Sequence, residues 1–226
     1  MANRAPFAGG EWYHCYNRGV DKRTVFSGAR DYARFIQLLY LCNSVTPKHR
    51  SDLYNLPTNR VLEIRRGPPL VAIGAFCLMP NHFHILLKER AEGGISRFMQ
   101  KMGVAYSMYF NIKNDHTGNV FLRPFRSRHV SDDQYFQHVV QYIHCNPAEL
   151  HERGWKDGNV KNLALLQKWL EEYPHSSLGS FHDRRHPLRA IVDNEAFDIV
   201  RPVAINKMLR EAAAYYEEIN NVKMTS

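Results

Sequence analysis

The chain has 226 residues, of which 44% are hydrophobic and 23% are charged. This composition is typical of a folded globular protein and excludes a wholly disordered chain, and the absence of a run of about 18 apolar residues excludes an integral membrane protein. Lysine and arginine number 30 against 22 aspartates and glutamates, a net charge of +8. Such an excess favours a polyanionic partner, of which nucleic acid is the commonest.

The cysteines are few and widely separated. They occupy positions 15, 42, 77 and 145, so no pair has the short spacing of a metal knuckle or of a dense disulfide framework. The N-terminal segment also lacks the apolar centre of a secretory signal. We therefore expect reduced thiols and a cytoplasmic protein of the bacterial cytosol or nucleoid, without a membrane partner.

Hydrophobic spacing predicts seven elements in the first 145 residues. Alternating apolar positions predict strands, and apolar positions that recur every three or four residues predict helices. In chain order these are a strand at 11–18, a helix at 28–44, strands at 70–78 and 82–88, a helix at 96–111, a strand at 120–130 and a helix at 131–145. The order predicts an α+β fold, with an antiparallel-rich sheet and helices packed on one of its faces.

Local signals set the expected limits of these elements. Ser27 is predicted to cap the helix at 28–44. Ser131-Asp132-Asp133 is predicted to supply the N-cap and the acidic first turn of the helix at 131–145. The segment 45–68 is polar and basic and predicts a long connection, with a short strand at 61–64. Pro124 favours an edge or a bulge in the strand at 120–130, because proline cannot donate a backbone hydrogen bond.

The chain beyond residue 150 is less regular. Helical spacing predicts helices at 161–170 and 204–220, and a basic, turn-rich stretch lies between them. We interpret residues 1–178 as one domain and residues 179–226 as a C-terminal appendage, first basic and then helical.

Two histidines flank a phenylalanine in His82-Phe83-His84. Side chains alternate along a strand, so both imidazoles project from one face while Phe83 points to the other. Such a pair can hold one divalent cation and leave positions open for substrate oxygens. Two half-buried histidines that only form hydrogen bonds would show the same pattern. Structural zinc is not expected, because no Cys/His pair has finger spacing.

The helix at 131–145 carries a polar stripe. His138, Tyr142 and Asn146 are spaced four residues apart and lie on one side of the helix, beside an apolar stripe. A tyrosine hydroxyl can attack a phosphorus next to a metal ion that polarises the phosphate, and the Asn146 amide oxygen could be a third ligand. The alternative is that Tyr142 is an aromatic residue at the rim and Asn146 only ends the helix.

Basic side chains cluster in the strand at 120–130, where arginines alternate with phenylalanines. Guanidinium groups can bind phosphates and rings can stack on bases, an arrangement that suits single-stranded nucleic acid. A solvated edge strand protected by charge is the alternative. The candidate DNA-binding residues are Arg18, Lys22, Arg23, Arg123, Arg126 and Arg128.

Five segments, in order over residues 11–178, carry a family resemblance. They are Tyr13–Gly19, Met79–Leu87 (MPNHFHILL), Asn119–Ser127, Tyr135–Pro147 with its YIHCNP ending, and Tyr173–Ser177 (YPHSS). Together they resemble the single-tyrosine HUH transposases of the insertion-sequence two-hundred type. The variant is most similar to the branch associated with repetitive extragenic palindromes.

The resemblance implies a ferredoxin-like fold and a relaxase-type reaction. His82, His84 and Asn146 would hold Mg²⁺ or Mn²⁺, with His138 a candidate supporting residue. Tyr142 would attack a phosphodiester of single-stranded DNA, leaving a 5′-phosphotyrosine and a free 3′-OH. The DNA of this family is typically a palindromic hairpin, and the protein would act as a monomer or a homodimer.

Three functions remain open on these residues. The first is a DNA transposase or a domesticated nickase-ligase with a tyrosine nucleophile. The second is a non-catalytic module that binds structured single-stranded DNA. The third is a metal-dependent hydrolase of a small phosphoester, which the extended basic surface argues against. The combination of His82, His84, Tyr142 and Asn146 favours the first.

Overall fold

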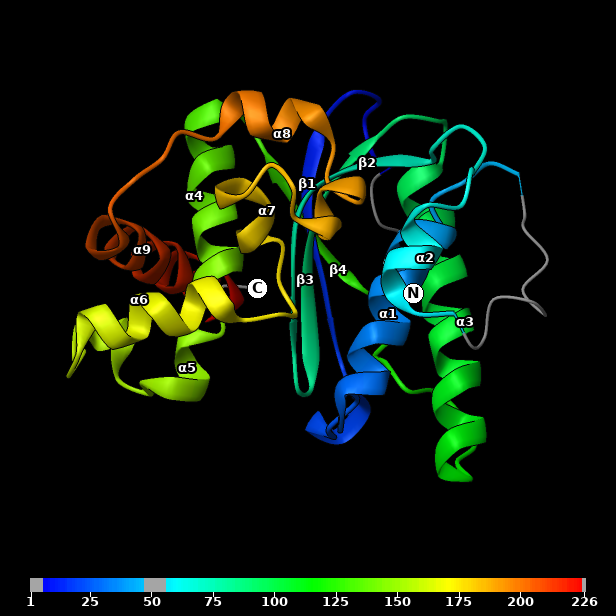
Figure 1. Ribbon diagram of the computed structural model, residues 1–226, viewed down its shortest axis with the longest axis horizontal. Coiled ribbons are helices and arrows are strands. Elements are labelled where there is room, and N and C mark those ends of the chain that lie inside the picture. Colours follow the sequence, from blue (N-terminus) through cyan, green and yellow to red (C-terminus); the bar gives the residue numbers. More distant parts are fainter. Residues whose placement is uncertain (1–5, 47–55, 225–226) are drawn as a thin grey trace.

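Four antiparallel strands form one sheet between two layers of helices in a computed structural model that describes residues 6–46 and 56–224 (Figure 1). The strands are β1 (Trp12–Arg18), β2 (Val71–Met79), β3 (His82–Glu89) and β4 (Arg126–Val130), in the order β2-β3-β1-β4. Each neighbouring pair is antiparallel. With α1 (Ala29–Leu41) after β1 and α3 (Gly94–Asn114) after β3, the chain has the β-α-β-β-α-β order of a ferredoxin-like fold. The predicted fold class is confirmed.

Helices cover both faces of the sheet, whereas the sequence analysis placed them on one face. Helices α1, α3 and the short α2 (Thr58–Leu62) lie on one side, and α4 (Asp133–Cys145) and α9 (Ile205–Met224) on the other (Figure 1). The reason lies in β2, all nine residues of which are buried. A strand that is apolar on both faces needs a helical layer on each.

Shorter elements complete the second layer and the connections. They are α5 (Ala148–His151), α6 (Leu163–Glu172), α7 (Leu178–His182) and α8 (Asn194–Ile199), with 3₁₀ turns η1 (Val20–Lys22), η3 (Trp155–Asp157) and η4 (Pro187–Ala190). Helix α6 and helix α9 confirm the two predicted tail helices.

Three predicted limits are wrong. Helix α1 has Gly28 at its N-cap instead of Ser27, because the Ser27 side chain donates to Asp31. Residues 61–64 do not form the expected strand. Val61 and Leu62 end α2, where their side chains are buried and the helix packs against α1. The strand expected over 120–130 begins only at Arg126, the first residue of β4, because Pro124 cannot donate a backbone hydrogen bond to a neighbouring strand.

The N-cap of α4 lies in the predicted segment Ser131-Asp132-Asp133, and the capping residue is Asp132. The Asp132 carboxylate accepts a hydrogen bond of 2.8 Å from the backbone N–H of Tyr135, which satisfies one of the donors left open at a helix N-terminus. The helix then buries Phe136, Val139 and Ile143 against the sheet.

The C-terminal region packs against α4 instead of extending away from it. The rings of Tyr215 on α9 and Tyr142 on α4 have centroids 4.9 Å apart, and Tyr215 is 3% exposed. The division of the chain at residue 178 stays a prediction. Residues 1–5, 47–55 and 225–226 of the predicted units lie outside the described residues.

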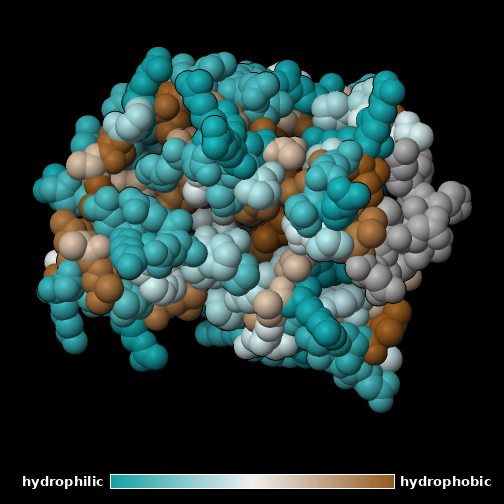
Figure 2. All heavy atoms as spheres, in the orientation of Figure 1, coloured by the Kyte–Doolittle hydropathy of each residue, from teal (hydrophilic) through white to brown (hydrophobic). Residues whose placement is uncertain are grey.

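The surface is mainly polar. Figure 2 shows hydrophilic residues over most of one face, with hydrophobic residues in separate patches. In the described part of the chain, no helix has the length and apolarity to cross a membrane. Cys15, Cys42, Cys77 and Cys145 are free thiols, all buried, as the sequence predicted.

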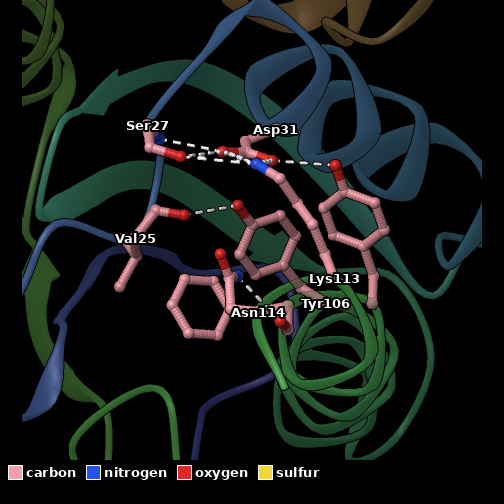
Figure 3. A network of polar contacts seen from close by, with 8 residues as sticks. Val25, Ser27, Asp31, Tyr106, Lys113 and Asn114 are labelled. Atoms are coloured by element: carbon pink, nitrogen blue, oxygen red, sulfur yellow. Dashed lines mark hydrogen bonds and ion pairs between the residues drawn. The ribbon is translucent and has the colours of Figure 1, made fainter. Parts of the chain in front are cut away.

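A buried carboxylate joins the helices α1 and α3 (Figure 3). Asp31 is 1% exposed and accepts hydrogen bonds from Lys113 Nζ at 2.6 Å and Tyr109 Oη at 2.8 Å. Ser27 adds its backbone N–H at 2.9 Å and its hydroxyl at 2.8 Å. Burial raises the pKa of the Asp31 carboxyl, but the four hydrogen bonds outweigh it and the pKa lies below its ordinary value.

We expect Asp31→Asn to lower the free energy of unfolding by about 2–3 kcal/mol at pH 7, because Lys113 loses its buried partner. A lowered folded-state pKa stabilises the fold above the unfolded-state value of about 3.9, and this contribution is lost as pH falls further. Urea unfolding at pH 7 and pH 3 should therefore show a smaller difference between parent and variant at pH 3. Equal stability at pH 7 would contradict this role.

Candidate active site between the sheet and helix α4

The two predicted histidines lie on the face of β3 that is covered by α4. Phe83, between them, contacts Phe35 of α1 on the opposite face, with ring centroids 4.9 Å apart. His84 is 5% exposed and His82 is half-buried. Their ring centroids are 5.1 Å apart and their planes nearly perpendicular. The alternation predicted from His82-Phe83-His84 is thus present in the structure.

Each of these histidines has a hydrogen bond at Nδ1. His82 Nδ1 is 2.7 Å from the Asn81 side-chain oxygen, and His84 Nδ1 is 2.9 Å from His14 Nε2. The Asn81 oxygen can only accept, so Nδ1 of His82 carries the proton and Nε2 carries the lone pair. Burial, reinforced by the positive charge of Arg18, lowers the pKa of His82 to about 4. The ring is therefore neutral at neutral pH, the form that binds metal.

Tyr142 reaches the histidines from α4. Its ring centroid lies 5.4 Å from that of His84 and 5.7 Å from that of His14, and the side chain is 4% exposed. Burial raises the pKa of the Tyr142 hydroxyl, while a hydrogen bond with Asn146 lowers it. The phenol is therefore protonated at neutral pH and must lose its proton in any attack on an electrophile.

Asn146 closes the same helix one turn later. It is 3% exposed, and its Nδ2 donates to the backbone oxygen of Tyr142 at 2.7 Å. This bond fixes the side-chain amide and leaves its oxygen as the atom that could bind a cation. The role of Asn146 as a ligand stays a prediction.

The donor set suits a mixed nitrogen and oxygen site. Across residues 6–46 and 56–224, no three His, Cys, Asp or Glu side chains gather into a metal site. A cation held by His82 and His84 would therefore take oxygen ligands from the Asn146 amide, from water or from a phosphate. Imidazole nitrogens together with amide, water or phosphate oxygens can hold a divalent cation.

Three of the predicted DNA-binding residues lie near the His82 end of the sheet. Arg18 ends β1 opposite His82 and is exposed. Lys22 is the last residue of η1, and Arg23 follows it. The side chain of Asn81, in the β2–β3 turn, donates a hydrogen bond from Nδ2 to the backbone oxygen of Lys22. The Arg23 guanidinium is 2.5 Å from His116 Nε2.

The other three follow the edge of the sheet. Arg126 and Arg128 pair with Tyr16 and His14 of β1 and therefore share the α4 face, as alternation predicted. Arg126 is exposed, whereas Arg128 is half-buried over the rings of two tyrosines on α4 and α9. Arg123 is exposed and lies in the loop before β4.

The candidate supporting residue His138 lies one turn before Tyr142 and is half-buried. A supporting contact to the metal ligands stays a prediction.

Sequence reasoning missed two residues of the site as functional candidates. His14 is fully buried and contacts His84, and Tyr215 on α9 contacts both His14 and Tyr142. Alternation along the strand at 11–18 places His14 on one face with Trp12 and Tyr16, and this is the signal by which the sequence could have indicated it. No such signal exists for Tyr215, which is 201 residues from His14.

Comparisons with known proteins connect this geometry to a family. Residues 69–146 match the sequence model of the family described as "Transposase IS200 like". The match covers about a third of the chain and contains His82, His84, Tyr142 and Asn146. The resemblance to the IS200-like transposases is confirmed. We refer to residues 69–146 as the IS200-like segment.

A solved structure supports the fold. The structure described as "Structure of the REP associates tyrosine transposase bound to a REP hairpin" matches with a TM-score of 0.51 at 14% sequence identity, over 91% of this chain and 92% of that chain. The likeness in fold thus extends well beyond the IS200-like segment. A comparison with curated proteins found no match.

Proposed function

We propose that this protein is a divalent-cation-dependent DNA transposase, or a domesticated nickase-ligase, with Tyr142 as its nucleophile. It would cleave and rejoin single-stranded DNA at hairpin-bearing sites through a 5′-phosphotyrosine intermediate. The observation that carries the proposal is the contact between Tyr142 on α4 and His84 on β3, with ring centroids 5.4 Å apart. Both residues belong to the IS200-like segment.

The reaction exchanges one phosphodiester for another. The Tyr142 oxygen attacks phosphorus, the bond from phosphorus to the 3′ oxygen breaks, and the phenol proton passes through solvent to the leaving oxygen. Rejoining is the reverse of this step, so no nucleotide energy source is needed. When bound, Mg²⁺ or Mn²⁺ would neutralise the charge that develops on the phosphate oxygens. His82, His84 and Asn146 would orient it beside the tyrosine.

Charge supports single-stranded DNA as the substrate. The protein carries a net charge of +8, and Arg18, Arg126 and Arg128 lie on or beside the face that contains the histidines. A basic face attracts the phosphate backbone and can release its counterions. A small phosphoester would need no such extended surface.

Non-catalytic binding of structured single-stranded DNA is the second candidate, because the basic face alone would permit it. That function does not require a tyrosine beside a pair of imidazoles. Incubation with hairpin-flanked oligonucleotides and Mn²⁺, followed by a denaturing gel, separates the two candidates, since only catalysis gives a covalent protein–DNA band.

We expect Tyr142→Phe to abolish the covalent band and to keep DNA affinity within about threefold, because binding depends mainly on phosphate contacts. The Phe variant keeps the buried ring, so the fold is retained. Tyr106→Phe is the matched control, since it also removes one buried tyrosine hydroxyl, on α3 in the opposite layer; it should still form the adduct. A Tyr142→Phe adduct would identify another nucleophile, with Tyr135 on the same helix the nearest alternative.

The exposed arginine of β4 gives a second prediction. Arg126→Ala should weaken DNA binding and reduce the log–log salt slope by roughly 0.7, the value for one phosphate contact on a single strand. Arg128 is held by tyrosine rings, so Arg128→Ala should also disturb packing and lower the thermal midpoint. The control is Arg60→Ala on α2, an exposed arginine of the opposite layer. An unchanged slope in Arg126→Ala would make β4 a solvated edge.

A further inference from the structure

His14 is a buried histidine to which neither the family resemblance nor the proposed reaction assigns a role, although it lies in the Tyr13–Gly19 segment that carries the resemblance. It lies on β1, is 0% exposed, and has both ring nitrogens in hydrogen bonds. Its Nε2 is 2.9 Å from His84 Nδ1, and its Nδ1 is 3.2 Å from the Tyr215 hydroxyl of α9. A buried polar ring with two partners, one of which is a candidate metal ligand, needs an explanation beyond core packing.

We infer that His14 is a positioning residue that fixes the proton of His84 on Nδ1 and so keeps Nε2 of His84 basic for the divalent cation. Tyr215, from the C-terminal helix, completes the arrangement by accepting a hydrogen bond from His14. The inference rests on the proposed function, since it assigns the support of the cation site used there.

The direction of the two hydrogen bonds follows from one requirement. A neutral imidazole has a single N–H, and cation binding at His84 Nε2 requires that proton on Nδ1. His84 then donates to His14 Nε2, which must be unprotonated. The His14 proton consequently lies on Nδ1 and is donated to the Tyr215 oxygen. In the opposite direction, His84 would carry its proton on Nε2 and could not bind a cation.

The surroundings keep His14 in the neutral form that this arrangement needs. A charged His14 would donate from both nitrogens and would force the proton of His84 onto Nε2. The ring is fully buried, and it lies opposite Arg128 in the β1–β4 register. Loss of solvation and a nearby guanidinium both disfavour a positive charge on the ring.

The same argument gives the C-terminal helix a part in the site. Tyr215 supplies the hydroxyl that accepts from His14, and its ring also packs on Tyr142 with centroids 4.9 Å apart. A helix outside the IS200-like segment thus supports both the candidate ligand and the candidate nucleophile. Removal of the Tyr215 hydroxyl should therefore weaken cation binding.

Calorimetric titration of the full-length protein with Mn²⁺, without DNA, tests the inference. His14→Gln places an amide oxygen at the level of Nε2 and can accept from His84, whereas His14→Asn places it at the level of Nδ1. We expect His14→Ala and His14→Asn to weaken Mn²⁺ binding about 10–100-fold, and His14→Gln to stay within about threefold of the parent. Tyr215→Phe should give an intermediate affinity.

His144→Gln is the matched control for the loss of a buried imidazole. His144 is 2% exposed, and its Nε2 is 2.8 Å from the Ser177 hydroxyl instead of a candidate ligand. This variant should be less stable yet bind Mn²⁺ within about twofold of the parent. Nitrogen-15 NMR of the metal-free protein gives a second readout. In the parent and in His14→Gln, we expect the proton of neutral His84 on Nδ1. In His14→Ala, we expect it to exchange between Nδ1 and Nε2.

Two results would overturn the inference. One is an unchanged Mn²⁺ affinity in folded His14→Ala. The other is an equal loss of Mn²⁺ affinity in His14→Ala, His14→Asn and His14→Gln that parallels a loss of thermal stability. The proposed function is contradicted separately if the His14 variants lose Mn²⁺ affinity as expected but the parent forms no adduct with DNA. If the parent forms the adduct and His14→Ala binds Mn²⁺ with the parent's affinity, the proposed function stands and the inference about His14 is wrong.

Discussion

The alternation of side chains along β3 is the constraint on which this structure depends. Phe83 packs on Phe35 in the layer of α1 and α3, and this contact determines which face of the strand the two histidines occupy. A shift of one residue in the register of β3 would exchange the faces, burying the imidazoles among the phenylalanines and turning Phe83 toward α4. The hydrophobic core therefore specifies the position of His82 and His84, and the site needs no separate folding signal.

Helix α4 packs on that face with a stripe of apolar side chains, and the neighbouring stripe carries the proposed nucleophile. Its apolar residues Phe136, Val139 and Ile143 are buried, and Tyr142 reaches the His84 ring from the next position around the helix. Asp132 fixes where the helix begins, so the tyrosine is held on a rigid element and not on a loop. Precise placement of this kind is what covalent catalysis by a weak nucleophile requires.

The sequence was sufficient where a local pattern carried the information. Alternation in β3 and helical spacing in α4 predicted the shared face of His82 and His84 and the stripe that carries Tyr142. Patterns of a few residues were not sufficient, as the segment 61–64 shows, because short apolar runs fit a helix or a strand and packing on α1 decided between them. The contact of Tyr215 with His14 joins residues 201 positions apart, so only the assembled fold could show it.

The proposed nucleophile Tyr142 would carry the covalent bond to DNA on its phenol oxygen. Mass spectrometry of peptides tests this after incubation of the protein with a hairpin-flanked single-stranded oligonucleotide and Mn²⁺, followed by nuclease and protease digestion. We expect a 5′-phosphonucleotide attached to the peptide that contains Tyr142, with a free 3′-OH on the released strand. Attachment at another residue, or cleavage without a covalent intermediate, would contradict it.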